Sequence, residues 1–110
     1  MAATLQDFKA ELFRTLANPV RIRIVESLRV AGSLTVGEIQ HRVGVEPSNV
    51  SQHLGALRAR GLVETRREGT SIWYSVRDVR LFDILDAARA IFDSQLAAQA
   101  EMVDAAGPRA

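Results

Sequence analysis

The chain has 110 residues, of which 47% are hydrophobic and 25% are charged, and its formal net charge at pH 7 is +1. This length and composition are typical of a single folded domain with a modest core. The chain contains no cysteine, which excludes disulfides, thiolate metal sites and thiol redox sensing by this chain. No apolar run approaches the ~18 residues of a membrane span, and the first residues show no signal-peptide pattern, so we expect a cytoplasmic protein without a membrane partner.

The charges are distributed unevenly along the chain. Residues 41–80 contain seven Arg and four acidic residues, whereas residues 81–110 contain two Arg and five acidic residues. The middle of the chain is therefore basic and its C-terminal part is acidic. Nearly all the basic residues are Arg, which forms bidentate contacts with phosphate or guanine, although a GC-rich genome also favours Arg.

Two helices are expected in the first third of the chain. Apolar residues at helical spacing predict a helix over about residues 4–16, and its apolar face needs a cover from elsewhere in the chain or from a second subunit. Asn18 and Pro19 are typical of a helix cap and first turn, so a second helix is expected up to about Val30, before Gly32. Arg21 and its neighbouring Arg residues lie off the apolar face of this helix. We interpret them as solvated surface, with phosphate contact as the alternative.

A third, short helix is expected over residues 36–43. Thr35 followed three positions later by Glu38 is a capping-box pattern, and Gly44 ends the helix. A fourth helix, also short, follows directly in residues 45–61. Two short helices joined by a tight turn that contains glycine form a helix-turn-helix, in which the second helix enters the DNA groove.

The helix expected in residues 45–61 has marked ends and one apolar face. Pro47 suits the first helical position, and Glu46 and Ser48 supply acceptors near the free amides of the first turn. Gly61 suits a left-handed C-cap. The apolar residues recur at i, i+4 and i+7 and are expected to be buried: Val50, Leu54 and Leu57.

The other face of this helix begins with compact side chains that donate and accept hydrogen bonds. They are Ser48, Asn49, Ser51, Gln52 and His53. A bland interpretation is a polar surface helix, but such groups are also those that read base edges in a major groove. Asn49 and Gln52 are the expected base contacts, because amides suit adenine, and the other three would bond to phosphates or bases.

After Gly61 the period becomes alternating, which predicts two strands over residues 62–67 and 72–76. Residues 68–71 form a hairpin turn in which Gly69 takes a positive φ. The resulting wing is expected to hold phosphate or reach the minor groove through Arg66, Arg67, Thr70 and Ser71. A lone hairpin is marginal in water, so this one must pack on the helices, and Trp73 is expected in the core rather than stacked on bases.

Asp78 is expected to cap a long last helix over about residues 79–103. At 1.5 Å per residue this helix is about 37 Å long, and its apolar stripe needs a partner. The simplest solution is a symmetric dimer in which the first and last helices of both subunits pack together. The expected dimer interface comprises Leu5, Phe8, Leu12, Leu81, Leu85, Ala88, Phe92 and Leu96. The whole chain, 1–110, is then a single domain with terminal dimerisation helices at about 4–16 and 79–103.

Three segments together resemble the ArsR/SmtB-type bacterial winged-helix repressors. They are Leu-Ala-Asn-Pro-Val-Arg-Ile-Arg-Ile at 16–24, Asn-Val-Ser-Gln-His-Leu-Gly-Ala-Leu-Arg-Ala-Arg-Gly-Leu-Val at 49–63, and the wing at 67–74. The resemblance covers about residues 5–100. It implies a mainly α fold with a small β-hairpin, a winged helix-turn-helix in the order α-α-α-α-β-β-α. It also implies a homodimeric repressor that binds a near-palindromic operator and usually releases it when an inducer binds.

The chain departs from the metal-sensing members of that family. Thr35 and Gly37 occupy the positions where those members carry a Cys-x-Cys pair. Other members place Asp, His and Glu ligands along the last helix, which here has acidic residues but no His. Zinc and softer metals prefer His or Cys, and the two His residues, His41 and His53, do not form a four-ligand site. We therefore expect neither a metal nor a cofactor. The inducer is left open between a small organic molecule and a partner protein, with control by protein abundance as a third alternative.

Two other functions are weighed against a DNA-binding regulator. A winged helix can serve as a dimerisation or protein-docking module, and the near-neutral net charge fits that alternative. The polar start of the helix in residues 45–61 argues against it. An enzyme is disfavoured because the chain lacks a Cys nucleophile, a Gly-rich phosphate loop and a His–carboxylate constellation. The expected partners are double-stranded DNA and a second copy of the chain.

Overall fold

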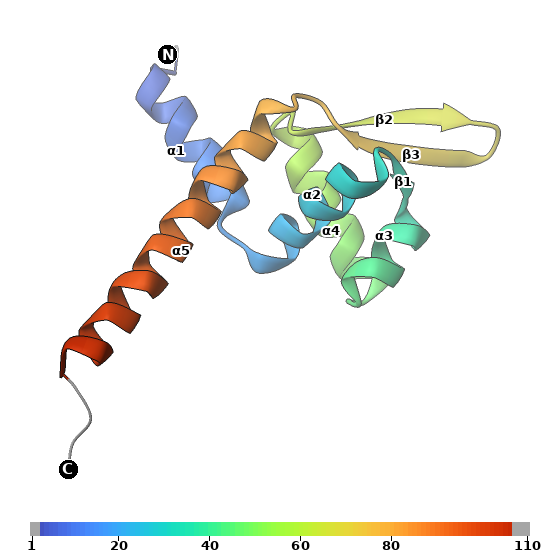
Figure 1. Ribbon diagram of the computed structural model, residues 1–110. Helices are drawn as coiled ribbons and strands as arrows, with labels where there is room; N and C mark the ends of the chain where they lie inside the picture. Colours follow the sequence, from blue (N-terminus) through green and yellow to red (C-terminus); the bar gives the residue numbers. More distant parts are fainter. Residues whose placement is uncertain (1–2, 107–110) are drawn as a thin grey trace. The chain divides into compact units, whose positions relative to one another are not determined.

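The computed structural model describes residues 3–106, which form two units (Figure 1). The first unit ends at Val79 and contains four helices and a small sheet. Its elements are α1 (Leu5–Leu16), α2 (Pro19–Ala31), β1 (Leu34–Thr35), α3 (Val36–Val43), α4 (Pro47–Ala59), β2 (Val63–Glu68) and β3 (Ser71–Val76). The second unit contains α5 (Arg80–Ala106). This order confirms the predicted winged helix-turn-helix and adds one short strand.

Side chains near the starts of the first three helices satisfy amides that have no partner inside the helix. The Asn18 side chain accepts hydrogen bonds from the backbone amides of Val20 at 2.8 Å and Arg21 at 3.3 Å. Thr4 and Asp7 form a reciprocal capping box at α1. At α3 the Thr35 hydroxyl accepts from the Glu38 amide, as predicted, but the Glu38 carboxylate accepts from the Thr35 hydroxyl and not from its amide.

The core of the first unit lies between α2, α3, α4 and the sheet. The predicted apolar face of α4 is buried, with Val50, Leu54 and Leu57 only 0%, 1% and 0% exposed. The other buried apolar residues of this unit are Leu16, Ile24, Val25, Leu28, Leu34, Ile39, Val43 and Val63. Burial of one complete stripe of α4 fixes which of its side chains face outward.

The sheet has three antiparallel strands in the order β1-β3-β2. Strands β2 and β3 form the predicted hairpin, and Figure 1 shows it extending beyond the helices of the first unit. Strand β1 was not predicted, and it pairs Leu34 with Tyr74 and Thr35 with Trp73. It could not be predicted because two residues are too few to display an alternating pattern. Leu34 is nevertheless buried, and it holds β3 beside α3.

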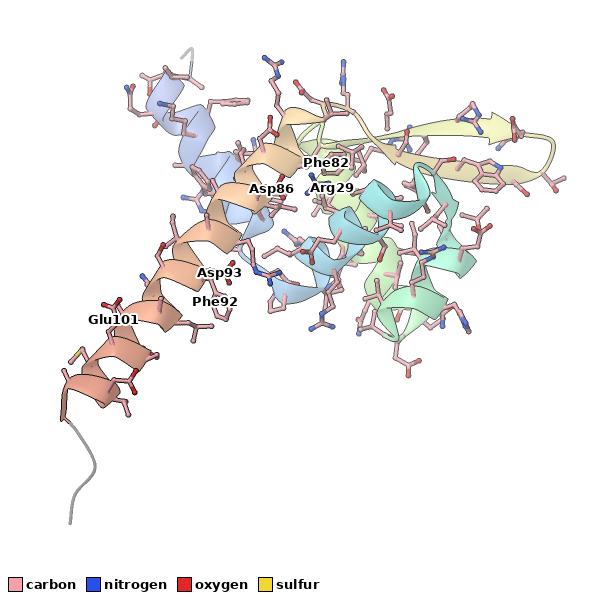
Figure 2. The ribbon with its side chains drawn as sticks, viewed as in Figure 1. Arg29, Phe82, Asp86, Phe92, Asp93 and Glu101 are labelled. Carbon is pink, nitrogen blue, oxygen red and sulfur yellow. The ribbon has the colours of Figure 1, made fainter. Side chains whose placement is uncertain are left out.

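Helix α5 is a single helix of 27 residues, about 40 Å long. It begins one residue later and ends three residues later than predicted. Figure 2 shows the side chains of Phe92, Asp93 and Glu101 along it, and Phe92 is 55% exposed. Among the helices of residues 3–106, none has the length and apolar character needed to cross a membrane.

Candidate nucleic-acid interface

Helix α4 presents a compact polar surface opposite its buried stripe. Ser48, Asn49, Ser51 and Gln52 are all exposed, and they lie in its first two turns. Because Val50 and Leu54 are held in the core, these four side chains are carried on a rigid support. The structure thus brings four of the five predicted recognition residues together on one accessible surface.

The start of α4 differs from the prediction in its capping. Glu46 is the N-cap residue, but its side chain makes no capping hydrogen bond. The Glu46 carbonyl accepts the backbone amides of Asn49 at 3.0 Å and Val50 at 3.1 Å. The expectation that Glu46 and Ser48 would supply capping acceptors is therefore wrong. A reason lies in Pro47, which lacks an amide and supplies a helical φ at the first position.

The C-terminal end of α4 is closed as predicted by a left-handed glycine. Gly61 has a φ of 70°, its amide bonds to the Arg58 carbonyl at 2.9 Å, and the Leu62 amide bonds to the Leu57 carbonyl at 3.0 Å. This pair of bonds is a Schellman motif. It turns the chain directly from the recognition helix into β2, so the helix and the wing are connected without a flexible linker.

His53, the fifth predicted recognition residue, has a different environment. It is half-buried, and its Nδ1 atom accepts a 3.1 Å hydrogen bond from Nε of Arg21. Burial and the nearby Arg21 charge lower the pKa of His53. Arg21 is itself half-buried, so it is not the solvated surface residue expected from the sequence.

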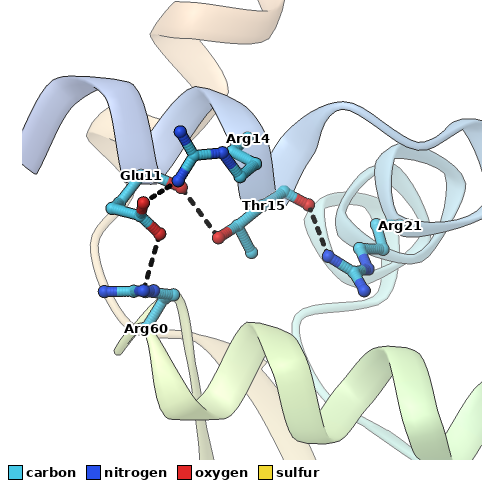
Figure 3. A network of polar contacts seen from close by, with 5 residues as sticks. All are labelled: Glu11, Arg14, Thr15, Arg21 and Arg60. Atoms are coloured by element: carbon cyan, nitrogen blue, oxygen red, sulfur yellow. Dashed lines mark hydrogen bonds and ion pairs between the residues drawn. The ribbon is translucent and has the colours of Figure 1, made fainter.

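A second polar connection joins the C-cap of α4 to α1 (Figure 3). Arg60 forms an ion pair of 2.6 Å with Glu11, which also pairs with Arg14. The Thr15 hydroxyl donates to the Glu11 carbonyl, and the Thr15 carbonyl accepts from Arg21 at 3.1 Å. Sequence reasoning did not identify this network, because contacts between distant positions leave no periodic signal in one sequence.

The wing ends in a two-residue turn. Glu68 pairs with Ser71, and Gly69 between them has a φ of 61°. A positive φ at the first turn position alone is typical of a type II′ hairpin, which agrees with the predicted role of Gly69. Thr70 and Ser71 are exposed at this tip, as are Arg66 and Arg67 on β2.

The position of Trp73 corrects a further expectation. Trp73 pairs with Arg66, and it is half-buried. Paired residues lie on the same face of a hairpin, and faces alternate along each strand. Trp73 therefore shares a face with Arg66, while the buried Val63 lies on the opposite face. Trp73 is not a core residue, because the pleat directs it away from the packed face.

The residues predicted for a dimer interface differ in accessibility within the single chain. Leu81 is buried, whereas Leu12 and Leu85 are half-buried. The remaining predicted interface residues are exposed: Leu5, Phe8, Ala88, Phe92 and Leu96. The apolar side chains of this exposed group lie on α1 and α5.

In the part of the chain that the structure describes, metal-ligating side chains are not gathered in one place. Within residues 3–106 there is no group of three or more His, Cys, Asp or Glu side chains that could hold a metal ion. His41 is exposed on α3, and His53 is engaged with Arg21.

Comparison with known proteins places these features among DNA-binding regulators. The helix-turn-helix domain family matches residues 16–66. Rv0081 of Mycobacterium tuberculosis, named as an HTH-type transcriptional regulator, is 46% identical over 88 residues, covering 79% of this chain and 76% of that protein. The biofilm growth-associated repressor of Xylella fastidiosa is 38% identical over 86 residues, covering 78% of this chain and 75% of the repressor.

Solved structures agree with the sequence comparison. The crystal structure of Rv0081 has a TM-score of 0.78 at 41% identity and covers 90% of this chain and 99% of that chain. A fragment of Mb0332 from Mycobacterium bovis has a TM-score of 0.73 at 30% identity, covering 87% of this chain and 94% of that chain. That fragment was solved by NMR as a homodimeric winged helix-turn-helix DNA-binding domain of a possible ArsR-family regulator.

Proposed function

Because this chain belongs to the ArsR-type winged helix-turn-helix transcriptional regulators, we propose that it represses transcription as a homodimer bound to an inverted-repeat operator. The observation that carries this proposal is the exposed polar surface of α4, supported from behind by buried Val50 and Leu54. A rigid helix with amide and hydroxyl groups at its N-terminal end suits the major groove. The chain lacks the cysteines of the metal-sensing members, so binding is proposed to be independent of metal.

Asn49 and Gln52 are proposed to read base edges. Both are exposed, and a side-chain amide can donate to N7 of adenine and accept from its exocyclic amine in a bidentate contact. Ser48 and Ser51 lie beside them and are proposed to bond to phosphates or bases. His53 has its Nδ1 atom engaged with Arg21, which leaves Nε2 for a contact with DNA.

The wing is proposed to contact the DNA backbone or the minor groove. Arg67 supplies the cation for this contact, and Thr70 and Ser71 supply hydroxyl donors at the tip. Arg66 is proposed to contribute less, because it forms a 3.5 Å ion pair with Glu68.

The terminal helices are proposed to form the dimer interface of a single domain that spans the chain. Leu5 and Phe8 on α1 and Phe92 and Leu96 on α5 expose apolar area that a second subunit would remove from water. The homodimeric state of Mb0332 supports this proposal. In this dimer the two recognition helices are proposed to lie about 34 Å apart, so that they enter major grooves one turn of DNA apart.

The relatives support a DNA-binding repressor rather than a protein-docking module without DNA reading. Relatives with 46% and 38% identity are named as a transcriptional regulator and a repressor. Regulators of this kind are not enzymes. The signal that would release the operator is proposed to be either a small molecule or a partner protein.

In-vitro selection on a random duplex DNA pool, with a chelator present, tests the proposal. Enrichment of an inverted repeat with half-sites about one helical turn apart is the expected result. Enrichment only after zinc or nickel is restored would contradict metal independence. No enrichment under either condition would favour the docking module over a DNA-binding repressor.

A further inference from the structure

Arg21 connects three helices through a single guanidinium group. It lies in the first turn of α2, three residues after the Asn18 cap. Its Nε atom donates to Nδ1 of His53 on α4 at 3.1 Å, and one of its terminal nitrogens donates to the Thr15 carbonyl on α1 at 3.1 Å. Arg21 and His53 are 32 positions apart in the sequence, so this contact is tertiary.

The Thr15 carbonyl is a suitable acceptor for such a bridge. It belongs to the last turn of α1, where backbone carbonyls have no amide partner within the helix. An Arg side chain that bonds to these carbonyls caps the helix end and interacts favourably with its dipole. The guanidinium is planar and rigid, so holding the Thr15 carbonyl also fixes the direction of the Nε–H bond toward His53.

The hydrogen bond from Arg21 determines the tautomer of His53. An Nδ1 atom that accepts a hydrogen bond carries no proton, so the neutral ring carries its proton on Nε2. A proton on Nδ1 would set two donors against each other, and in the doubly protonated ring it would also bring two cations together. Helix α3 packs against α4 and carries three titratable groups, Glu38, His41 and Arg42. The charge that acts on His53 nevertheless comes from Arg21.

We propose that Arg21 is a positioning residue for DNA recognition, which holds His53 as its Nε2–H tautomer and fixes α4 against the C-terminal end of α1. Gln52 precedes His53 in the same helical turn. A change in the position of His53 therefore displaces the base-reading surface of α4. This inference rests on the proposed function because it assigns DNA contact to α4. The two hydrogen bonds from Arg21, to His53 and to the Thr15 carbonyl, form a tether between α4 and α1 that exists in the free protein.

NMR of the ¹⁵N-labelled full chain tests the tether without DNA. The chain has two His residues, so the ring signals are readily assigned, and exposed His41 provides an internal reference. Wild-type His53 is expected to show the Nε2–H tautomer. Arg21→Gln is expected to raise the pKa of His53 because the neighbouring cation is removed, whereas Arg23→Gln is expected to leave it unchanged. An Nδ1–H tautomer, or identical His53 titration in both variants, would overturn the proposal.

DNA affinity tests whether the tether positions α4. Arg23 is the matched control, because it lies exposed on the same helix and carries the same charge. Arg21→Gln is expected to weaken operator binding about tenfold or more, with a much smaller loss on random duplex, since hydrogen bonds to charged groups are among the stronger ones. Arg23→Gln is expected to weaken both duplexes equally and slightly. Equal losses on both duplexes for Arg21→Gln would make Arg21 a general charge contact and overturn the proposal.

A double-mutant cycle with His53→Ala completes the test. If the two residues act through one contact, the loss of operator affinity in the combined variant is clearly smaller than the sum of the losses in the two single variants. Additive losses would overturn the coupling. Arg21→Lys guards against loss of folding, because it keeps the charge but cannot hold both acceptors with one planar fork. It is expected to keep wild-type affinity for random duplex and lose operator preference. A wild-type chain that binds no duplex selectively would contradict the proposed function, and the NMR result would still decide the tether.

Discussion

Arg66 and Arg67 are neighbours in the sequence but lie on opposite faces of the β2–β3 hairpin. Arg66 pairs with Trp73 and Arg67 with Ile72, and the strand pleat sends successive side chains to opposite sides. Arg66 also forms an ion pair with Glu68, two positions along the same face. Arg67 has no ion pair or hydrogen bond within residues 3–106. The two residues therefore differ in the charge that they can offer to DNA.

Arg67→Gln is expected to reduce DNA affinity on all sequences and to lower the salt slope of binding by about 1, because one phosphate contact is lost. Arg66→Gln should have a smaller effect, because Glu68 already balances its charge. Binding isotherms over a range of salt concentrations measure both slopes. The wing assignment would be contradicted by an unchanged slope in Arg67→Gln.

Two glycines provide a matched pair for stability. Gly55 lies inside α4, where an added Cβ would meet no atom within 4 Å, so Gly55→Ala should stabilise the chain by about 0.5–1 kcal/mol. Gly44 ends α3 with a φ of 75°, so Gly44→Ala should destabilise it by about 1–2 kcal/mol. Urea unfolding gives both values. The two changes in unfolding free energy should have opposite signs. A destabilising Gly55→Ala would contradict the described environment of α4.

The pH dependence of stability should carry a contribution from His53. The pKa of His53 is lowered in the folded chain from an unperturbed value of 6.5. Its contribution is therefore fully present above pH 6.5 and is lost as the pH falls below 6.5, because the unfolded chain takes up the proton first. Unfolding free energies measured between pH 8 and pH 5 should show this loss.

Two substitutions isolate the His53 contribution. His53→Gln removes the titrating group while keeping an acceptor for Arg21, so the loss below pH 6.5 should shrink. His41→Gln leaves the contact between Arg21 and His53 in place and should retain the loss. Asp7, whose pKa is lowered by its hydrogen bonds with Thr4, affects stability only at much more acidic pH. A wild-type profile matching that of His53→Gln would refute the contribution.

Exposed apolar side chains on α5 test the proposed dimer. Phe92→Asp should shift the sedimentation profile from dimer toward monomer, because it places a charge where a second subunit would remove apolar area from water. Operator affinity should fall in parallel, since two linked half-site contacts become one. Val30→Asp is the control, because Val30 is an exposed apolar residue on α2. Equal dissociation in both variants would argue against α5 as the interface.

Local chemistry made much of the fold predictable. Asn18 with Pro19, Gly44 and Gly61 each mark a helix boundary through backbone requirements that depend on adjacent residues, and the structure has those boundaries. The apolar spacing of α4 identified its buried face, and thereby the exposed side chains of its first turns. Patterns with a short period are visible in one sequence because every residue in the window contributes to them.

Features that depend on distant partners were not predictable in the same way. The bonds between Arg21 and His53 and between Arg60 and Glu11 join residues 32 and 49 positions apart, and each involves one side chain from each segment. Strand β1 is defined only by its pairing with β3. Trp73 was assigned to the core because a lone hairpin must pack on the helices, but strand register directs it to the other face of the hairpin.

Base reading by α4 is tested most directly with Gln52→Ala, measured by competition between the selected operator and random duplex. Gln52 is exposed, and its truncation should cost about 1–3 kcal/mol on the operator, relax specificity at one base pair in each half-site, and leave random-duplex binding nearly unchanged. Gln99→Ala, an exposed glutamine on α5, should change neither. Equal losses on operator and random duplex for Gln52→Ala would contradict base reading by this helix.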